Sequence, residues 1–354
     1  MKKKDKKEKQ EKTPFVSICM PTFNRRPFIP IIIKCFENQT YPKDKIEWII
    51  VDDGTDKIED LVAHIPQVKY FKYDEKMSLG KKRNITNEKA RGDIIIYMDD
   101  DDYYPPERIS HAVTTLQKNP KALCAGSSTM YMYFKHIDKM YEFGPYGPNH
   151  ATAATFAFRK ELLQQTRFDE TACVAEEKKF LKNYTIPFVQ LDPLKSILVF
   201  SHNHNSFDKK VLLEQMPNPF IKDTPLKPSD FVKEPEVLKF FMEDINKLLD
   251  DYKPGLPENK PDVTKQIAEM KESREKMIQD HEKKQNDYNN LMNKLTNVNP
   301  QMAQGKIDNL TFIVQELTME NNQLKEKVKY LEDKMKLLIM EQIQFKRNCT
   351  ARQN

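Results

Sequence analysis

The sequence contains no long apolar run, and this absence argues against two classes of protein. A membrane span needs about 20 nearly continuous apolar residues, and a secretory signal needs an apolar stretch after its basic start. Residues 1–12 are rich in lysine, but no such stretch follows them. We therefore expect a cytoplasmic protein without a membrane span, with residues 1–13 as a disordered lysine-rich tail.

Cysteine is scarce, and common nucleotide-binding motifs are missing. The five cysteines are scattered without CxxC spacing, which argues against a zinc site or a disulfide scaffold. No GxGxxG occurs, and Glu75 stands where a P-loop ending in Gly80-Lys81 needs glycine. The lysine tail has no interleaved arginine or aromatic residues, so we expect no nucleic-acid partner.

Apolar residues are concentrated in the first two-thirds of the chain, whereas Lys, Glu, Asn and Gln dominate the last third. With 38% hydrophobic and 31% charged residues, the whole is too polar for one compact globule. The pattern predicts a folded domain at residues 14–206 and a proline-rich linker at 207–261 with one helix near 236–252. A helical spacer at 262–299 and a coiled coil at 305–347 follow.

Strand and helix patterns alternate within residues 14–119. Short Val- and Ile-rich runs predict strands at 15–20, 47–51, 69–73 and 93–98. Helical patterns at 27–37, 79–90 and 106–119 separate or follow them. This alternation predicts an α/β sheet with its functional site at the carboxyl ends of the strands.

The last segment carries a heptad repeat. The a positions are Ile307, Val314, Asn321, Val328, Met335 and Gln342, and the d positions are Leu310, Leu317, Leu324, Leu331, Leu338 and Phe345. Leucine at d with one asparagine at a favours a parallel homodimer, with a trimer as the second possibility. The alternative is a single amphipathic helix lying on the folded domain.

Four acids follow the predicted strand at 93–98. Adjacent carboxylates repel each other unless a cation lies among them. On a strand end, Asp99 and Asp101 point to one side, and Asp100 and Asp102 to the other. Such an oxygen-rich site suits Mg²⁺ or Mn²⁺ bridging two phosphates, whereas the alternative is a solvated acidic turn.

Three more motifs accompany these acids in order. They are Pro-Thr-x-Asn-Arg at 21–25, Val-Asp-Asp-Gly at 51–54 and Gly-x-x-Arg-Asn at 80–84, with Asp-x-Asp at 99–101. With them, residues 14–206 resemble a family 2 glycosyltransferase of the GT-A fold, an α/β nucleotide-diphospho-sugar transferase with a Rossmann-like mixed sheet. Processive members carry membrane spans and a Gln-x-x-Arg-Trp motif, but the single tryptophan here is Trp48. The resemblance therefore implies a soluble, non-processive, inverting enzyme.

The resemblance also implies roles at matching positions. Residues expected to bind a UDP- or GDP-sugar donor are Pro21, Thr22, Arg25, Asp53, Arg83, Asp99 and Asp100. Asp53 would contact the base or ribose, and Arg83 the diphosphate. Asp101 and Asp99 would hold Mn²⁺ or Mg²⁺ with His202, for which His204 is the alternative.

The resemblance places an acidic pair after the acceptor-side segment to supply the general base. Glu177 stands at the base position, with Glu176 as the alternative, and both could instead be acids of a first helical turn. The loop at 144–150 would face a glycan or protein acceptor. Because Ala175 and Glu177 replace the commoner Gly and Asp, the competing hypothesis is an inactive GT-A scaffold oligomerised by its coiled coil.

Overall fold

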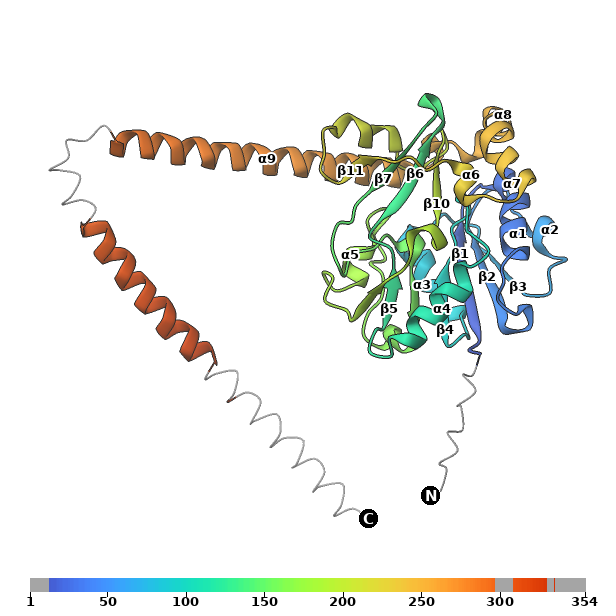
Figure 1. Ribbon diagram of the computed structural model, residues 1–354, viewed down its shortest axis with the longest axis horizontal. Coiled ribbons are helices and arrows are strands. Elements are labelled where there is room, and N and C mark those ends of the chain that lie inside the picture. Colours follow the sequence, from blue (N-terminus) through green and yellow to red (C-terminus); the bar gives the residue numbers. More distant parts are fainter. Residues whose placement is uncertain (1–12, 297–307, 330–333, 335–354) are drawn as a thin grey trace, which may run out of the picture. The chain divides into compact units, whose positions relative to one another are not determined.

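The computed structural model describes residues 13–296, 308–329 and 334, and Figure 1 shows it. The chain divides into two compact units, residues 1–271 and residues 272–354. The first unit contains both β-sheets, and the second contains only helix among its described residues. The site therefore has to be sought in the first unit.

The larger sheet has the strand order β3-β2-β1-β4-β8-β5-β9. Its strands are β1 (Val16–Thr22), β2 (Ile46–Asp52), β3 (Val68–Lys72), β4 (Ile94–Tyr97), β5 (Cys124–Gly126), β8 (Ala157–Arg159) and β9 (Phe188–Gln190). β1 to β4 run parallel, whereas β8 is antiparallel to both β4 and β5. The mixed α/β sheet that the resemblance implies is therefore present, and each predicted strand up to residue 98 lies within two residues of an observed one.

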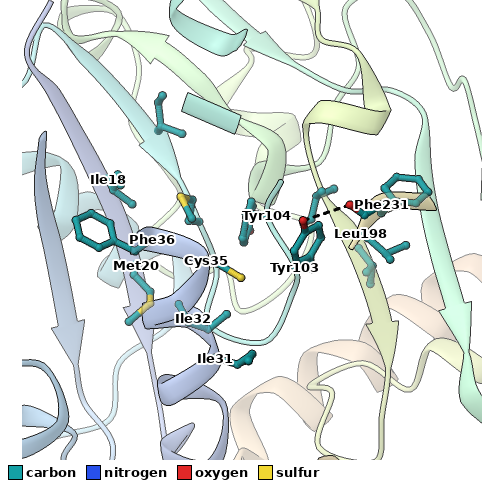
Figure 2. Packing of buried hydrophobic residues seen from close by; sticks show 14 of the residues in the cluster. Ile18, Met20, Ile31, Ile32, Cys35, Phe36, Tyr103, Tyr104, Leu198 and Phe231 are labelled. Carbon is teal, nitrogen blue, oxygen red and sulfur yellow. Dashed lines mark hydrogen bonds between the residues drawn. The ribbon is translucent and has the colours of Figure 1, made fainter. Parts of the chain in front are cut away.

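Side chains of successive strand residues point to opposite faces of the sheet. Because the central strands are apolar at both kinds of position, both faces are covered by helices. On one face, Ile18 and Met20 pack with Phe36 of α1 (Ile29–Glu37), and Figure 2 shows this core. The helices α2 (Glu59–Val62) and α4 (Arg108–Lys118) contribute to the same cluster. On the other face, Cys19 and Tyr97 pack in a second cluster beside α3 (Leu79–Lys89) and α5 (Glu177–Phe180).

A smaller sheet has the order β10-β6-β7-β11. Its strands are β6 (Met130–Phe134), β7 (Lys139–Phe143), β10 (Leu198–Ser201) and β11 (Ile221–Asp223). β10 runs parallel to β6, and the other two pairs are antiparallel. The Tyr103 hydroxyl donates to the Phe231 carbonyl at 3.2 Å, which ties the end of the acidic run to the segment beyond β11 (Figure 2).

Residues 207–261, expected as a linker, pack into the core of the first unit. They contain α6 (Pro228–Phe231), α7 (Pro235–Lys239), a π-helical turn at Phe240–Asp244 and α8 (Ile245–Asp250). Phe231, Val237 and Phe241 are buried in the larger hydrophobic cluster. The helix expected near 236–252 is observed, but the π-helical turn lies between its two α-helical parts, α7 and α8. The consecutive residues Phe240 and Phe241 of this turn are both buried.

Short 3-10 turns join these elements. They lie at Arg26–Phe28, Lys43–Lys45, Lys135–Ile137, Ala153–Thr155, Lys160–Gln164, Pro193–Lys195, Lys209–Gln215, Lys253–Gly255 and Pro257–Asn259. The long helix α9 (Pro261–Thr296) follows the last of them.

Residues 308–329 are also helical, and the heptad residues that they include are exposed on this single chain. Ile307, Leu331, Met335, Leu338, Gln342 and Phe345 lie outside the described residues. Oligomerisation through the repeat remains a prediction. Over the residues that can be described, no helix has the length and apolar character needed to cross a membrane.

Candidate active site

A cavity of about 370 Å³ lies at the carboxyl ends of β1 and β4. Most of the residues singled out from the sequence line it, namely Pro21, Arg25, Arg83, Asp99, Asp100, Asp101, Glu176 and Glu177. Thr22, Asp53 and His202 do not line it, although all three are buried close to residues that do. The structure thus brings together side chains from β1, α3, the acidic run and the segment before α5.

The Gly-x-x-Arg-Asn motif docks α3 against the segment that leads to the glutamates. A Cβ on Gly80 would lie 1.8 Å from the Asp169 carbonyl oxygen, so only glycine allows this approach. The Asn84 side chain donates to the Phe168 carbonyl at 3.1 Å and accepts the Phe168 N–H at 2.9 Å. The motif therefore fixes where residues 168–177 lie relative to the sheet.

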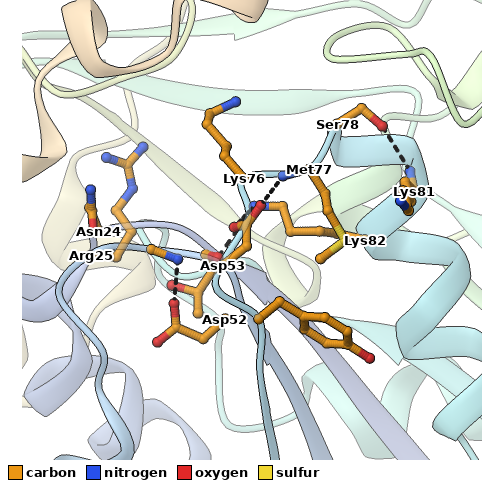
Figure 3. Close-up of polar contacts among 12 residues, drawn as sticks. Asn24, Arg25, Asp52, Asp53, Lys76, Met77, Ser78, Lys81 and Lys82 are labelled. Atoms are coloured by element: carbon orange, nitrogen blue, oxygen red, sulfur yellow. Dashed lines mark hydrogen bonds and ion pairs between the residues drawn. The ribbon is translucent and has the colours of Figure 1, made fainter.

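Asp53 is fully buried and holds the start of α3 in place. Its carboxylate accepts the Met77 N–H at 2.5 Å and the Lys82 ammonium at 2.7 Å, as Figure 3 shows. Lys82 also donates to the Thr22 carbonyl at 3.2 Å. Both Asp53 oxygens are thus used inside the protein, and the predicted contact with a base or ribose remains a prediction. The neighbouring Lys76 and Met77 do line the cavity.

Arg83 joins two of the candidate acids. Its terminal nitrogens donate to the two Asp99 oxygens at 3.2 Å each, and its Nε donates to Glu176 at 2.7 Å. Burial lowers the pKa of Arg83, but the charges of Asp99 and Glu176 outweigh it and hold that pKa well above its ordinary value. The guanidinium also lies over the Tyr97 ring at 4.5 Å. Arg83 is thus a buried cation already paired with protein carboxylates.

Two other acids of the run, Asp100 and Asp101, contact Arg25. Its Nε lies 3.5 Å from Asp100, and its Nη2 lies 3.3 Å from Asp101. Burial raises the pKa of Asp100 to about 6 and that of Asp102 well above its ordinary value, the latter with help from the charge of Asp101. Against the effect of burial, Arg25 and His202 hold the pKa of Asp101 well below its usual range. Asp101 is therefore the firmly ionised member of this group.

His202, rather than His204, lies beside Asp101. The His202 Nε2 is 3.4 Å from an Asp101 oxygen, and its Nδ1 accepts the His204 N–H at 3.2 Å. Burial lowers the pKa of His202 to about 3, so the ring is neutral. The His204 ring instead stacks on Tyr252 at 6.2 Å. The direct contact of His202 with a metal remains a prediction.

The acidic run presents carboxylate oxygens, the ligand type that hard cations prefer. Among the described residues, no three His, Cys, Asp or Glu side chains are placed to hold a metal ion by themselves. Mg²⁺ is usually bound by only one or two carboxylates, with substrate phosphates completing its shell. The Asp102 Oδ1 is buried without a hydrogen-bond partner in the described structure. The clustered carboxylates, raised acid pKa values and oxygen-only donors fit such a shared site.

The two glutamates differ sharply in environment. Glu176 is buried and paired with Arg83, whereas the Glu177 carboxylate lines the cavity and has no side-chain hydrogen bond or ion pair to another residue within the described part of the chain. Burial, followed by the charge of Glu176, raises the pKa of Glu177 to about 7. Ala175 before them has a φ of 54°, a conformation that favours glycine. The geometry thus separates a held carboxylate from a free one facing the cavity.

Two charged residues of the cavity wall, Lys260 and Asp262, belong to no motif in the sequence and were not predicted as site residues. Lys260 is 4% exposed, and its Nζ donates to the Ser206 hydroxyl at 2.9 Å. Burial lowers the pKa of Lys260 to about 6, and the charge of Arg25 adds to the effect. Asp262, in the first turn of α9, forms an ion pair with Lys76. A single charged residue in a polar, proline-rich segment has no periodic pattern from which its burial could be predicted. Pro261, between the two residues, indicates only that a helix starts there.

The first turns of α9 also hold the segment before the glutamates. The Gln266 Oε1 accepts the backbone N–H of Cys173 at 2.7 Å and of Val174 at 3.0 Å. Its amide nitrogen donates to the Thr171 carbonyl at 3.1 Å. Residues far outside the motif region therefore help to position the candidate base.

Comparison with known proteins gives one family. Residues 17–182 match the model described as glycosyl transferase family 2. The chain is 27% identical over 212 residues to an uncharacterized glycosyltransferase of Haemophilus influenzae, covering 55% of this chain and 78% of that protein. It is 27% identical over 116 residues to the poly(ribitol-phosphate) beta-N-acetylglucosaminyltransferase TarS of Staphylococcus aureus, covering 29% of this chain and 19% of TarS.

Solved structures resemble the chain more distantly. A mannosyltransferase of Pyrobaculum calidifontis, in complex with GDP-Man and Mn²⁺, is 18% identical with a TM-score of 0.45, covering 55% of this chain and 59% of that one. A likeness of this size is too weak to bear on substrate or metal.

Proposed function

We propose that the chain is a glycosyltransferase that moves a sugar from a nucleoside-diphosphate sugar to an acceptor hydroxyl with inversion; the match of residues 17–182 to the glycosyl transferase family 2 model supports this proposal. The observation that carries the proposal is the free Glu177 carboxylate, which shares one cavity with the acids of the run at 99–102. Such a transfer needs a base that removes the proton of the acceptor hydroxyl. It also needs groups that stabilise the charge of the leaving diphosphate, and an acidic cluster suited to a metal ion meets this second need. Each transfer is a single, non-processive event.

The donor end of the cavity offers groups for a diphosphate. The Arg25 Nη1 is buried without a hydrogen-bond partner in the described structure. The Lys260 amine, whose pKa burial lowers to about 6, has only a neutral hydroxyl beside it, and a neighbouring anion would favour its protonated form. Such groups are costly to bury unless an anion satisfies them. Asp101 and Asp99 would hold Mn²⁺ or Mg²⁺, which supplies positive charge against the leaving diphosphate. The donor is a UDP- or GDP-sugar.

Glu177 acts as the general base in this proposal. The acceptor oxygen forms a bond to the anomeric carbon while the bond from that carbon to the diphosphate oxygen breaks. The hydroxyl proton passes to the Glu177 carboxylate, and the diphosphate departs with the electron pair. A base with a pKa near 7 combines a large ionised fraction with useful basicity at neutral pH. Glu176 stays ion-paired with Arg83 and positions its neighbour.

A screen of UDP- and GDP-sugars with and without Mn²⁺ tests the proposal. We expect one donor to raise the melting temperature of the full chain by several degrees and to be hydrolysed slowly without acceptor. Asp101→Asn should abolish turnover, as should a chelator, whereas the exposed Asp44→Asn should not. Retention of most activity in Asp101→Asn would exclude the metal role. Donor binding without any turnover would instead favour the inactive scaffold.

We also propose that the heptad repeat forms a parallel homodimer. Val314, Leu317 and Leu324 are each more than half exposed, and a second copy of the repeat would cover them. Sedimentation of the full chain at micromolar concentration should give a dimer, and Leu317→Lys with Leu324→Lys should give a monomer. A wild-type monomer would contradict the proposal, and a trimer would correct its stoichiometry. The proposed cytoplasmic location can be tested by cell fractionation.

A further inference from the structure

Four aromatic rings form a row on the surface of the first unit. The Phe220 and Tyr146 ring centroids are 5.2 Å apart, those of Tyr146 and His150 are 5.0 Å apart, and those of His150 and Tyr184 are 5.2 Å apart. Tyr146 is 44% exposed and Phe220 is 41% exposed, while His150 and Tyr184 are half-buried. Single exposed aromatics need no explanation, but a contiguous row marks a binding surface.

The loop that carries Tyr146 and His150 is held firmly. The Ser128 hydroxyl accepts the N–H of Tyr146 at 2.8 Å and of Gly147 at 3.0 Å. The Gln190 side chain donates to the carbonyls of Pro148 at 2.8 Å and His150 at 3.0 Å. These bonds position the two rings before any ligand arrives, which lowers the entropic cost of binding.

Tyr184 is held by a strained turn. Its φ is 64°, and Asn183 and Lys182 before it have φ of 54° and 48°. Three consecutive non-glycine residues in the left-handed region are uncommon and cost free energy, so the surrounding structure must enforce them. The Asn149 side chain donates to the Tyr184 carbonyl at 3.1 Å, which links this turn to the loop at 144–150.

Residues next to the row in sequence line the candidate cavity and a second hollow beside it. Thr152 and Ala153, which follow His150 closely in sequence, line that cavity. A second hollow, lined in part by Lys182 and Asn183, shares Ala175 and Glu176 with the cavity. Tyr184 follows Asn183 directly, and burial, followed by the charge of Glu177, raises the pKa of its hydroxyl. One end of the row therefore lies near the proposed base, and the other end, Phe220, leads away from it.

We propose that the row Phe220–Tyr146–His150–Tyr184 binds an oligosaccharide acceptor and directs its terminal hydroxyl toward Glu177. The inference rests on the proposed function. A sugar ring has an apolar C–H face that packs on aromatic rings and hydroxyls at its rim that need polar partners. Asn149, Asn183 and Lys182 beside the rings supply such partners.

The experiment measures binding of maltohexaose, chitohexaose and mannohexaose to the full chain by saturation-transfer NMR and calorimetry. We expect wild type to bind at least one of them, and Tyr146→Ala with Phe220→Ala to lose at least tenfold in affinity. Donor-nucleotide affinity should change much less. Tyr146→Trp should restore oligosaccharide binding because it restores a ring. The matched control is Tyr288→Ala, an aromatic of similar exposure in the second unit.

The outcomes separate this inference from the proposed function. Undiminished oligosaccharide binding in the double variant would overturn the acceptor row, as would transfer by wild type to proteins but to no oligosaccharide. If wild type turned over no donor yet lost oligosaccharide binding in the double variant, the proposed function would fail and the glycan-binding row would stand.

Discussion

The Arg83 Nε donates to Glu176 at 2.7 Å, so the guanidinium of α3 fixes the carboxylate beside the proposed base. The same guanidinium holds Asp99 at the end of β4. Three segments that are distant in sequence therefore meet at one buried cation. Because both partners of Arg83 are acids of the candidate site, its removal should affect the acidic run and the glutamate pair together.

Replacing Arg83 by lysine should impair both stability and turnover. Lysine keeps the charge but cannot donate in parallel to Asp99 while also reaching Glu176. Removing one partner of a buried ion pair lowers the free energy of unfolding by about 3–5 kcal/mol. Because lysine keeps the positive charge, we expect a smaller loss of about 2 kcal/mol here. Urea unfolding and steady-state kinetics measure the two effects. Lys81→Arg on the exposed side of the same helix is the control. Wild-type kinetics in Arg83→Lys would refute the pairing role.

Removing the carboxylate of Glu177 should abolish proton removal while leaving the fold intact. Glu177→Gln should lower kcat by about 10²- to 10⁴-fold, the range of a general base, with little change in donor KM. Glu176→Gln should instead unpair Arg83, so it should lower thermal stability as well as kcat. If Glu176→Gln proved the more damaging to kcat without any loss of stability, the assignment of the base would be reversed.

The raised pKa of Glu177 predicts how turnover depends on pH. The base works only when ionised, so kcat/KM should rise with pH and level off above a pKa of about 7. This rising limb should disappear from the residual activity of Glu177→Gln. A flat profile of the wild type between pH 5.5 and 8.5 would exclude this role for Glu177.

The same pKa makes an opposite prediction for stability. The folded pKa of about 7 lies above the ordinary value of 4.5, so the folded state binds more protons than the unfolded state between these values. Stability from this group is therefore lost as pH rises from about 4.5 to 7. Glu177→Gln should be more stable than wild type by about 1–2 kcal/mol at pH 8 and nearly equal to it at pH 4. Denaturant melts at both pH values measure the difference.

Lys260 should matter for the donor although it lies outside the residues that match the family model. Its amine is buried in the cavity wall with one hydroxyl partner, so Lys260→Met should remove the proposed diphosphate contact while keeping most of the packing. We expect donor KM to rise about tenfold, because the free energy of one charge-assisted hydrogen bond corresponds to about a tenfold change in affinity. Lys260→Arg should recover part of the loss, and the exposed Lys265→Met should change nothing. Unchanged donor binding in Lys260→Met would remove Lys260 from the site.

The sequence predicted the residues that end strands better than the partners that those residues find. The run at 99–102 and the motif arginine were recognisable because strand ends and short motifs are local features. The pairing of Arg83 with Glu176 joins residues 93 positions apart, and no local pattern specifies it. Burial then separates the two adjacent glutamates, which the sequence alone left as alternatives.

Residues 207–261, predicted from the sequence as a linker, pack into the folded domain. Their prolines and charges are typical of a linker, yet β11 joins the smaller sheet, and Phe231, Val237 and Phe241 of the helical segments that follow it are buried in the larger hydrophobic cluster. Scattered apolar residues in irregular backbone carry no period of 2 or 3.6 from which burial could be read. The fold was therefore predictable where it is regular and motif-bearing.

The contacts of Gln266 with residues 171–174 have a practical consequence for anyone who isolates the enzyme. A fragment cut near residue 182, where the family match ends, would lack β9, β10 and β11, and one cut at residue 206 would lack β11. Both would lose several core aromatic residues and the Gln266 contacts with residues 171–174. The inactivity of either fragment would say nothing about catalysis. The smallest piece that can be judged fairly extends to residue 271, where the first compact unit ends.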